Sequence, residues 1–210
     1  MLSRLSELND KYVQNNGFGC GDEAFVFTDR SSKLVLSAPH AVKTYLSGKV
    51  KSADLFTGAL VDFVGEKCKI STLIRTSYQD KEYLADEFIK VQNIGEKFFL
   101  DIHGMVDHED FELAVGTGLL EADAYQKAIN EIDVIGQKYG LRKVLNHPHY
   151  SGIAGMKALT ARMQMFTGKP LALQLEIGRE YRDFQEFPKK VIKKTVPFLQ
   201  ELVLNLEKQL

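Results

Sequence analysis

The chain has 210 residues, of which 44% are hydrophobic and 26% are charged, and its 27 basic residues nearly balance its 28 acidic residues. This composition is typical of a soluble globular protein with a sizeable core, and the small net charge excludes a general electrostatic affinity for nucleic acid. No repeat, low-complexity tract or linker divides the chain, so a single domain spanning residues 1–210 is expected.

Nothing in the sequence has the pattern of a membrane segment or a secretory leader. Residues 1–16, MLSRLSELNDKYVQNN, are amphipathic and polar, and no segment reaches the ~20 apolar residues that span a bilayer. Cys20 and Cys68 form no CxxC pair, so reduced thiols are the default expectation and a single disulfide is the alternative. A cytoplasmic protein with no membrane or nucleic-acid partner is therefore expected.

The first half of the chain predicts strands and helices in alternation. Residues 23–40, EAFVFTDRSSKLVLSAPH, predict two strands joined by a polar turn. Residues 52–67 have helical spacing, with Leu55, Ala59, Phe63 and Val64 on one side. Residues 68–77 are rich in β-branched side chains and predict a strand, and residues 80–92 predict a helix.

A strand at residues 97–104, KFFLDIHG, changes character at its end. One face carries only apolar side chains, whereas the other continues from Phe99 to Asp101 and His103. A carboxylate and an imidazole therefore share one face just before Gly104, which would let substrate or backbone come close.

The remaining elements complete an alternating pattern. Shorter strands are predicted at residues 111–117, 142–146 and 171–177. The clearest helix is residues 121–140, with Gly140 as its stop and a buried side formed by Tyr125, Ile129, Ile132 and Ile135. A C-terminal helix, residues 191–210, is expected to kink or restart near Pro197. Several strands are too apolar to face water, which predicts an α/β fold with helices covering a mixed, largely parallel sheet.

Reactive side chains lie at the ends of three predicted strands: His40, His103 and Glu176. Ligands of open α/β sheets collect beyond the carboxyl ends of the strands. Two imidazoles and a carboxylate are a common ligand set for catalytic zinc, and Asp54, expected in the first turn of a helix, could supply the carboxylate. Asp101 could orient an imidazole from behind. Each residue alone also has a structural interpretation, such as an exposed histidine, a helix-dipole aspartate or an ion-paired glutamate.

A resemblance connects these residues. The segments SAPHA (37–41), KSADLFTGAL (51–60), LDIHGM (100–105), VGTG (115–118) and LALQLEIGREYR (171–182) occur in an order that resembles the N-formylglutamate amidohydrolase family, which is related to zinc carboxypeptidases and aspartoacylase. The resemblance implies a three-layer αβα, zinc-exopeptidase-like fold and hydrolysis of an amide by a metal-activated water. It places His40, Asp54 and His103 at metal-site motifs, with zinc or another divalent transition metal as cofactor, and Glu176 at the position of the catalytic glutamate.

The sequence departs from the related carboxypeptidases at one position. They carry a glutamate three residues after the first histidine, where this chain has Lys43, so the third metal ligand must come from elsewhere, with Asp54 as the best candidate. The resemblance also implies that residues 146–155, NHPHYSGIAG, border the substrate, with His149 and Gly152 as contact candidates. A metal role for His147 or His149 is the alternative.

The resemblance also implies a small-molecule substrate that carries a carboxylate, for which an arginine fork is the natural receptor. Arg75 is the first candidate, followed by Arg179, Arg182 and Arg162. The leading hypothesis is a metal-dependent amidohydrolase acting on a small N-acyl amino acid such as N-formylglutamate, with Glu176 as general base. The alternatives are a carboxypeptidase-like hydrolase of a peptide or γ-glutamyl bond, and a non-catalytic descendant that binds a metal or ligand.

Overall fold

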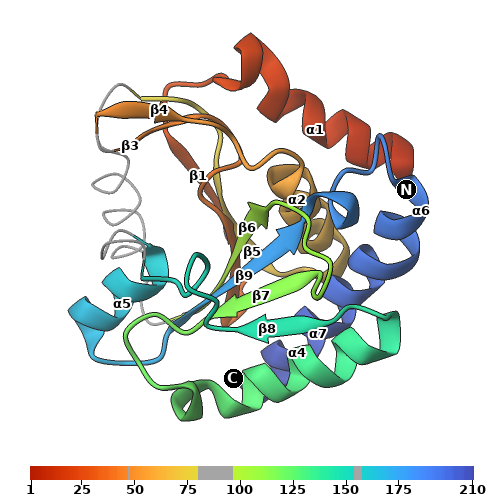
Figure 1. Ribbon diagram of the computed structural model, residues 1–210. Coiled ribbons are helices and arrows are strands. Elements are labelled where there is room, and N and C mark those ends of the chain that lie inside the picture. The colour runs from red at the N-terminus through yellow and green to blue at the C-terminus, as the bar shows by residue number, and fades with distance from the viewer. Residues whose placement is uncertain (47, 80–96, 154–157) are drawn as a thin grey trace.

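A mixed seven-stranded sheet, in the order β1-β5-β2-β6-β9-β7-β8, forms the centre of the molecule (Figure 1). The computed structural model describes residues 1–46, 48–79, 97–153 and 158–210. The strands of this sheet are β1 (Phe25–Thr28), β2 (Leu34–Ala38), β5 (Ser71–Arg75), β6 (Phe98–Met105), β7 (Leu113–Gly116), β8 (Lys143–Leu145) and β9 (Ala172–Gly178).

The four central strands, β5, β2, β6 and β9, run parallel to one another. At one edge β1 joins β5 antiparallel, and at the other β7 is antiparallel to β9 and parallel to β8. The carboxyl ends of the central strands therefore meet at one edge of the sheet, where open α/β folds bind their ligands.

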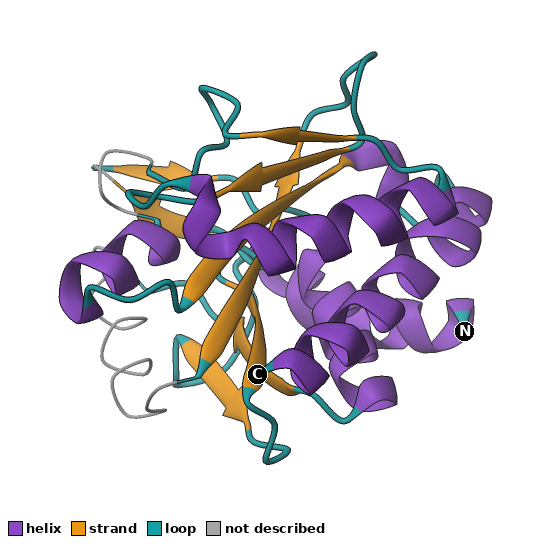
Figure 2. Ribbon diagram, turned by 90° about the horizontal axis from the view of Figure 1, so that it is seen from below, coloured by secondary structure: helices purple, strands orange, loops and turns teal. Residues whose placement is uncertain are grey.

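Helices cover both faces of the sheet, giving three αβα layers (Figure 2). The helices are α1 (Leu2–Gly17), α2 (Thr57–Cys68), α4 (Gln126–Tyr139), α5 (Leu159–Thr167) and α7 (Val196–Gln209), with the short segments η1 (Ala122–Tyr125), η3 (Arg179–Tyr181), α6 (Pro188–Lys190) and η4 (Val191–Thr195). On one face, α2 contacts β2, β5 and β6, and α7 contacts β2. Helix α1 packs against α2 and helix α4 packs against α7, whereas on the other face α5 contacts β6 and β9.

The core has two parts because successive side chains of a strand point to opposite faces. Leu36 and Leu100 belong to the larger cluster, which lies between the sheet and α2, α4 and α7. Val35 and Phe99 belong to a smaller cluster, which includes Leu159 of α5 on the other face. Burial of each large apolar side chain contributes about 1.5–3 kcal/mol, so both faces of the sheet stabilise the fold.

Most of the elements predicted from sequence are confirmed. The predicted strands at residues 23–40, 68–77, 97–104, 111–117, 142–146 and 171–177 all occur, although the two strands of the first segment are separated in the sheet by β5. Helix α4 follows a single 3₁₀ turn and ends at Gly140 in the left-handed conformation, φ 65°. At the C-terminus, π-helical winding in η4 gives way to the α-helix α7 next to Pro197, where a change was predicted.

The helix predicted for residues 52–67 begins later than expected, at Thr57. Phe56 adopts the left-handed conformation, φ 72°, which breaks the helix on its amino side. Leu55, expected on its apolar side, is 46% exposed in the preceding loop. The placement of Asp54 in the first helical turn was therefore wrong. The helix predicted for residues 80–92 lies outside the described residues.

Apart from short helical turns, three parts of the described fold had no sequence prediction: helix α1, helix α5 and a separate hairpin formed by β3 (Thr44–Leu46) and β4 (Lys49–Lys51). The hairpin strands are only three residues long, and the turn includes Gly48 with φ 78°. Such short strands leave no readable alternation of polar and apolar residues.

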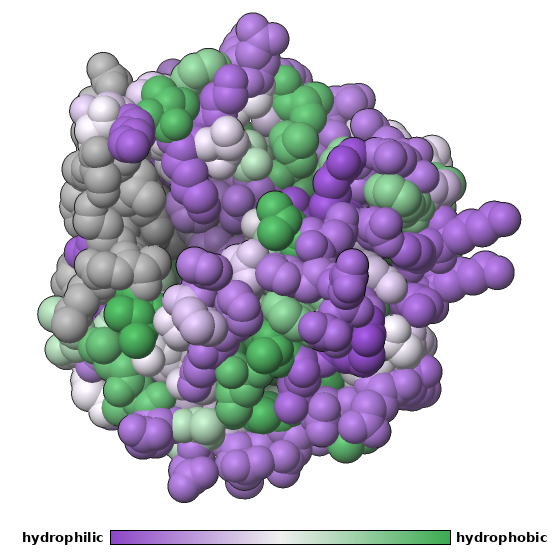
Figure 3. Space-filling view, viewed as in Figure 1, coloured by the Kyte–Doolittle hydropathy of each residue, from purple (hydrophilic) through white to green (hydrophobic). Residues whose placement is uncertain are grey.

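The surface has the polar character expected from the composition. On the face seen in Figure 3 hydrophilic residues predominate, and hydrophobic residues form small separate groups. Across the described ranges, no helix combines the length and apolar character needed to cross a bilayer. Cys20 is exposed and Cys68 is half-buried, and both are free thiols rather than the disulfide considered as an alternative.

Candidate functional site

Polar side chains form a row on one face of the sheet, at its carboxyl edge. In the parallel register Asp101 lies beside Ser37 of β2 and Gln174 of β9, and His103 lies beside Glu176 of β9. These residues share the face of the smaller apolar cluster and continue it toward the ends of the strands. The same face is thus apolar at one end and polar at the other.

His103 lies between two carboxylates. Its Nε2 is 2.9 Å from Oδ2 of Asp101, and its Nδ1 is 3.3 Å from Oδ2 of Asp54. Asp101 is fully buried, and its Oδ1 accepts a hydrogen bond of 2.5 Å from the hydroxyl of Ser37. The imidazole is therefore held in orientation from both sides, by Asp101 and by Asp54.

Asp54 is fixed by backbone contacts in the loop before α2. Its N–H donates to the carbonyl of His40 over 2.7 Å, and its Oδ2 accepts from the N–H of Gly104 over 3.2 Å. The hydroxyl of Thr57 donates to the Asp54 carbonyl over 2.7 Å, and this contact anchors the loop to the first turn of α2. These contacts bring together the segments after β2, before α2 and at the end of β6.

His40 lies just beyond β2 and is 4% exposed. Its Nδ1 is 3.3 Å from the hydroxyl of Thr44, and its ring centre is 5.1 Å from that of His103, with an interplanar angle of 55°. Lys43, at the position where related carboxypeptidases have a glutamate, instead lies over the ring of Phe18, 4.5 Å from its centre. The structure therefore brings both predicted histidines together without a ligand from position 43.

The electrostatics differ sharply between the two histidines. Burial lowers the pKa of His40 well below its ordinary value, and the positive charge of Lys51 adds to this, so the ring is neutral at physiological pH. Burial also acts to lower the pKa of His103, but Asp101 and Asp54 outweigh it and raise the pKa well above the ordinary value. Burial would raise the pKa of Asp54, yet the hydrogen bond with His103 and the charge of Lys51 hold it well below its usual range.

Glu176 lies beside this group on β9 and is 8% exposed. Its Oε1 accepts a hydrogen bond of 2.9 Å from the amide of Gln174, which fixes the carboxyl group. Burial is the largest influence on its pKa and raises it. A carboxylate whose pKa is raised toward neutrality is suited to accept a proton and return it.

These side chains line a cavity of about 350 Å³ that lies at the carboxyl edge of the sheet. Its lining consists of His40, Lys51, Asp54, His103, Gly104, Pro148, His149, Tyr150, Ser151, Gly152, Ala158, Gln174 and Glu176. The predicted metal, catalytic and loop residues therefore open onto one space, which is large enough for a small molecule.

The loop at residues 148–152 reaches the cavity by crossing closely over β7. A Cβ atom at Gly116 would lie 2.5–2.6 Å from backbone atoms of Tyr150, Ser151 and Gly152, so glycine is required there. Gly152 itself has φ 78°, a conformation that favours glycine. His149 and Gly152 are thereby placed at the cavity. His147 instead stacks on Tyr150, with ring centres 5.1 Å apart, outside the described cavity lining.

The arginines considered for substrate binding lie elsewhere. Arg75 is fully buried, with its guanidinium 4.8 Å from the ring centre of Phe25 and Nη1 donating to the carbonyl of Ser77. Arg179 forms ion pairs with Asp183 and Glu186. Neither is among the described residues that line the cavity.

Arg182 lies directly beneath the site. Its Nη1 donates to the carbonyls of Met105 and Ile177 over 2.6 and 2.7 Å, and its Nε donates to the carbonyl of Leu55 over 3.1 Å. A Cβ atom at Gly104 would lie 2.6 Å from Nε, so the glycine leaves room for this guanidinium. Arg182 thus binds three backbone segments rather than facing the cavity.

Several residues of the site had no assigned role from sequence: Ser37, Thr44, Lys51, Tyr150 and Gln174. The first and last lie at alternate positions of predicted strands, so a correct strand order would have placed them beside Asp101 and Glu176. Thr44 and Lys51 come from the unpredicted hairpin, where they face each other across the strands. No local pattern in the sequence distinguishes that lysine from an exposed one.

A zinc ion suits this donor set in chemistry and in pairwise geometry. Ligand atoms about 2.0–2.1 Å from a tetrahedral ion lie ~3.3 Å apart, and imidazoles on one ion have ring centres about 5 Å apart. The His103–Asp54 and His40–His103 separations of 3.3 and 5.1 Å agree with these values. Within the described ranges, however, no three His, Cys, Asp or Glu side chains stand ready to hold a metal. The donors therefore fit in pairs, and the contact of Nδ1 of His40 with Thr44 leaves Nε2 as the nitrogen of His40 that could bind the ion.

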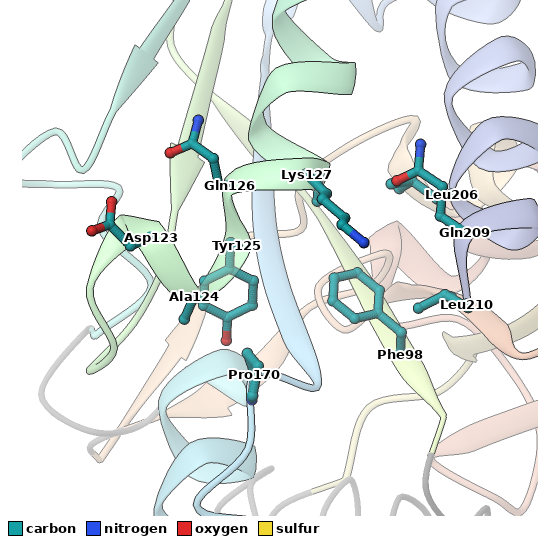
Figure 4. A pocket seen from close by; sticks show the side chains of 11 residues that line it. Phe98, Asp123, Ala124, Tyr125, Gln126, Lys127, Pro170, Leu206, Gln209 and Leu210 are labelled. Atoms are coloured by element: carbon teal, nitrogen blue, oxygen red, sulfur yellow. The ribbon is translucent and has the colours of Figure 1, made fainter.

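A second cavity, of about 410 Å³, lies at the opposite end of the sheet (Figure 4). The rings of Phe98, at the start of β6, and Tyr125 line it together with Pro170 and the last residues of α7. Its described lining includes Asp123 as the single carboxylate side chain and has no histidine. The paired histidines and carboxylates line the other cavity, so the cavity at the carboxyl edge is the candidate site.

Comparison with solved structures finds the same fold in hydrolases. A bacteriophage poly-γ-glutamate hydrolase matches with a TM-score of 0.57 and 12% identity, over 91% of this chain and 93% of that chain. An N-formylglutamate amidohydrolase from Ralstonia eutropha JMP134 matches with a TM-score of 0.57 and 13% identity, over 89% and 97%. A zinc-free apo form of YNDL matches with a TM-score of 0.51 and 14% identity, over 88% of each chain.

No protein-family model and no curated protein sequence matches the chain. At such low identity the structural likeness establishes the fold and nothing finer. The predicted three-layer, zinc-exopeptidase-like α/β fold with a mixed, largely parallel sheet is thus confirmed.

Proposed function

We propose that this chain is a metal-dependent amidohydrolase of a small carboxylated substrate, with an N-acyl amino acid such as N-formylglutamate as the leading candidate. It would then be a distant member of the N-formylglutamate amidohydrolase family, which its motifs resemble. The observation that carries the proposal is the buried contact of His103 with Asp54 and Asp101, beside His40 and Glu176 in one cavity. The fold shared with two amide-cleaving hydrolases supports it.

His40, Asp54 and His103 would hold the metal ion. When bound, the ion would lower the pKa of a water molecule to about 7 and polarise the amide carbonyl. Asp101, itself held by Ser37, fixes the ring of His103 through Nε2 and leaves Nδ1 on the side of Asp54. These residues therefore divide into ligands and the groups that orient them.

Glu176 would take the proton of the attacking water and return it to the leaving amine. Its burial, the raised pKa and the fixed carboxyl group are the properties that a general base needs near neutral pH. The hydrogen bond from Gln174 occupies Oε1, so the other carboxylate oxygen, Oε2, is the one assigned to the proton.

A γ-glutamyl bond is the second candidate substrate. The poly-γ-glutamate hydrolase and the N-formylglutamate amidohydrolase match this chain with equal TM-scores of 0.57, and both names specify an amide of glutamate. The non-catalytic alternative is disfavoured because Glu176 keeps both the position and the environment of a base.

Replacement of Glu176 by glutamine tests the function. The variant keeps the shape of the side chain and loses the base, so zinc content should persist while kcat falls by about 100- to 10,000-fold. Zinc-loaded wild type and variant are assayed on N-formylglutamate, other N-formyl amino acids and a γ-glutamyl dipeptide, with exposed Glu121→Gln as the matched control.

Three results separate the alternatives. Normal turnover by Glu176→Gln removes this residue from the mechanism, and loss of zinc makes it a ligand. Wild-type protein that binds zinc but cleaves none of these amides contradicts the proposed activity.

A further inference from the structure

The β3–β4 hairpin carries a lysine into the candidate site. Thr44 and Lys51 face each other across the hairpin, and Thr44 contacts His40 while the Nζ of Lys51 lies 3.6 Å from Oδ1 of Asp54. The side chain of Lys51 is 38% exposed and lines the cavity. The hairpin therefore adds one accessible positive charge beside the predicted metal ligands.

Lys51 is the single lysine or arginine among the described residues that line the cavity. Arg75 is buried against Phe25, Arg179 is engaged in ion pairs at the surface, and Arg182 donates to backbone carbonyls. The receptor for a carboxylate inside this cavity is therefore expected on the hairpin rather than among the arginines.

An anionic ligand would otherwise enter an acidic space. Asp54 and Glu176 both line the cavity, and like charges at short range disfavour binding in a partly desolvated site. Burial is the largest influence on the pKa of both carboxyl groups, and the charge of Lys51 opposes it at each. The ammonium is thus within electrostatic range of both.

We infer that Lys51 is the receptor for the carboxylate of the substrate, an inference that rests on the proposed amidohydrolase function. The distance of 3.6 Å to Asp54 exceeds the ~2.7–2.9 Å of a charge-assisted hydrogen bond, and an ammonium has three donors. Lys51 can therefore bind a second carboxylate while it remains beside Asp54.

The choice of lysine also indicates the class of substrate. An ammonium on a flexible stem acts as a point charge and accepts a carboxylate from several directions, whereas arginine favours a two-pronged geometry. Lys51 is consequently suited to amides whose carboxylate position varies, such as the α- and γ-carboxylates of glutamate derivatives. Neutral amides of the same shape should bind weakly.

Three substitutions on the hairpin test this role. Lys51→Met removes the charge and keeps most of the stem, and Lys51→Arg restores a charge. Lys49→Met is the matched control, because Lys49 lies on the same strand, is exposed and is outside the described cavity lining. Each protein is assayed on N-formylglutamate, N-formylglutamine and N-formylisoglutamine.

Lys51→Met should raise KM for N-formylglutamate by about 10- to 100-fold, because it removes a charged hydrogen bond to the substrate, and kcat should change only a few-fold. For the analogue in which a carboxamide replaces the recognised carboxylate, KM should be nearly the same in Lys51→Met as in wild type. Lys51→Arg should recover most of the loss, and Lys49→Met should match wild type. An equal loss on all three compounds, or a fall in kcat alone, would overturn the inference and assign Lys51 to Asp54.

A binding measurement keeps this inference separate from the proposed function. Calorimetric titration with glutamate and glutamine should show that wild type prefers the carboxylate and that Lys51→Met loses the preference. If wild type hydrolyses none of the compounds but shows this binding preference, the proposed activity is wrong and the assignment of Lys51 as the carboxylate receptor is supported. If Lys51→Met retains the full preference for glutamate, the receptor lies elsewhere.

Discussion

Asp101 is the residue on which the orientation of His103 most directly depends. It is fully buried, and its two oxygens are engaged by the hydroxyl of Ser37 and by Nε2 of His103. A carboxylate behind a metal-binding imidazole selects the tautomer and increases the basicity of the ring. The contact with His103 thus explains why an aspartate, Asp101, is buried near the end of β6.

Asp101→Asn should reduce the affinity for zinc by about 10- to 100-fold, because an amide donor in place of an oxygen disturbs the tautomer of His103. Competition titration against a zinc chelator measures the change, with Asp123→Asn at the opposite cavity as the control. Thermal unfolding monitored by circular dichroism distinguishes this effect from loss of the fold. Unchanged zinc affinity in a folded variant would leave Asp101 without a supporting role.

At the scale of single residues, what could be predicted depended on regular spacing. Asp101 and His103 could be proposed as site candidates because side chains alternate along a strand with a period of two residues, and Glu176 because its strand has the same pattern. Lys51 and Thr44 belong to strands of three residues, where no repeat can be read. The predicted roles of Arg75 and Arg179 rested on charge alone, and charge does not reveal that one stacks on Phe25 and the other pairs at the surface.

At the scale of elements, one guanidinium joins the segments that carry the site. Arg182 donates to the carbonyls of Leu55, Met105 and Ile177, each of which lies one or two positions from a site residue on the loop before α2, on β6 or on β9. Relative movement of these segments would change the separations among Asp54, His103 and Glu176. We therefore treat Arg182 as a positioning residue.

Arg182→Lys should lower kcat by about tenfold or more with little change in KM, because one ammonium cannot replace the planar fork that spans these carbonyls. Arg179→Lys, three positions earlier and exposed, is the control. Steady-state kinetics and zinc content are measured together with the melting temperature. A variant with lower stability but unchanged kcat and zinc content would make Arg182 a stabilising residue only.

Element boundaries were the least predictable part of the fold. The helix at α2 was placed too early because the spacing of its apolar residues continues through Leu55, whereas the left-handed backbone at Phe56 ends it. Backbone conformation of this kind has no signature in side-chain periodicity. The hairpin strands escaped prediction because they are only three residues long, and α5 because it is a short helix of nine residues.

At the scale of the whole molecule, both apolar clusters are built on the same strands. Val35 and Leu36 are neighbours on β2 but belong to different clusters, as Phe99 and Leu100 do on β6. Neither layer of helices can separate from the sheet without exposing apolar surface on a strand that also holds the other layer. The three layers are therefore coupled through the sheet.

Unfolding in urea should consequently be one cooperative transition, as the single-domain prediction requires. Far-UV circular dichroism reports the helices, and tyrosine fluorescence reports the tertiary environment, since the chain has eight tyrosines and no tryptophan. The two transitions should coincide at the same urea concentration. Separate midpoints would indicate two independently folding units.

The fold class itself was readable from sequence because it depends on the alternation of strands and helices and on the apolar character of the strands. The order of strands was not readable, since β5 inserts between β1 and β2 through pairing that no local pattern encodes. The row of polar residues across β2, β6 and β9 depends on that order. Single residues of this row could be proposed as site candidates from sequence, but only the structure shows that they lie side by side.

The long sequence separation of the site residues also determines when they come together during folding. Ser37 and Asp101 are 64 positions apart in sequence, and Asp54 and His103 are 49 apart. Each contact closes a long loop of disordered chain, whose entropic cost precedes any stabilisation, and topologies rich in such contacts fold slowly. In a nascent or partly folded chain these side chains are therefore present but not yet close to one another. The cavity at the carboxyl edge of the sheet is therefore expected to be complete only in the native state.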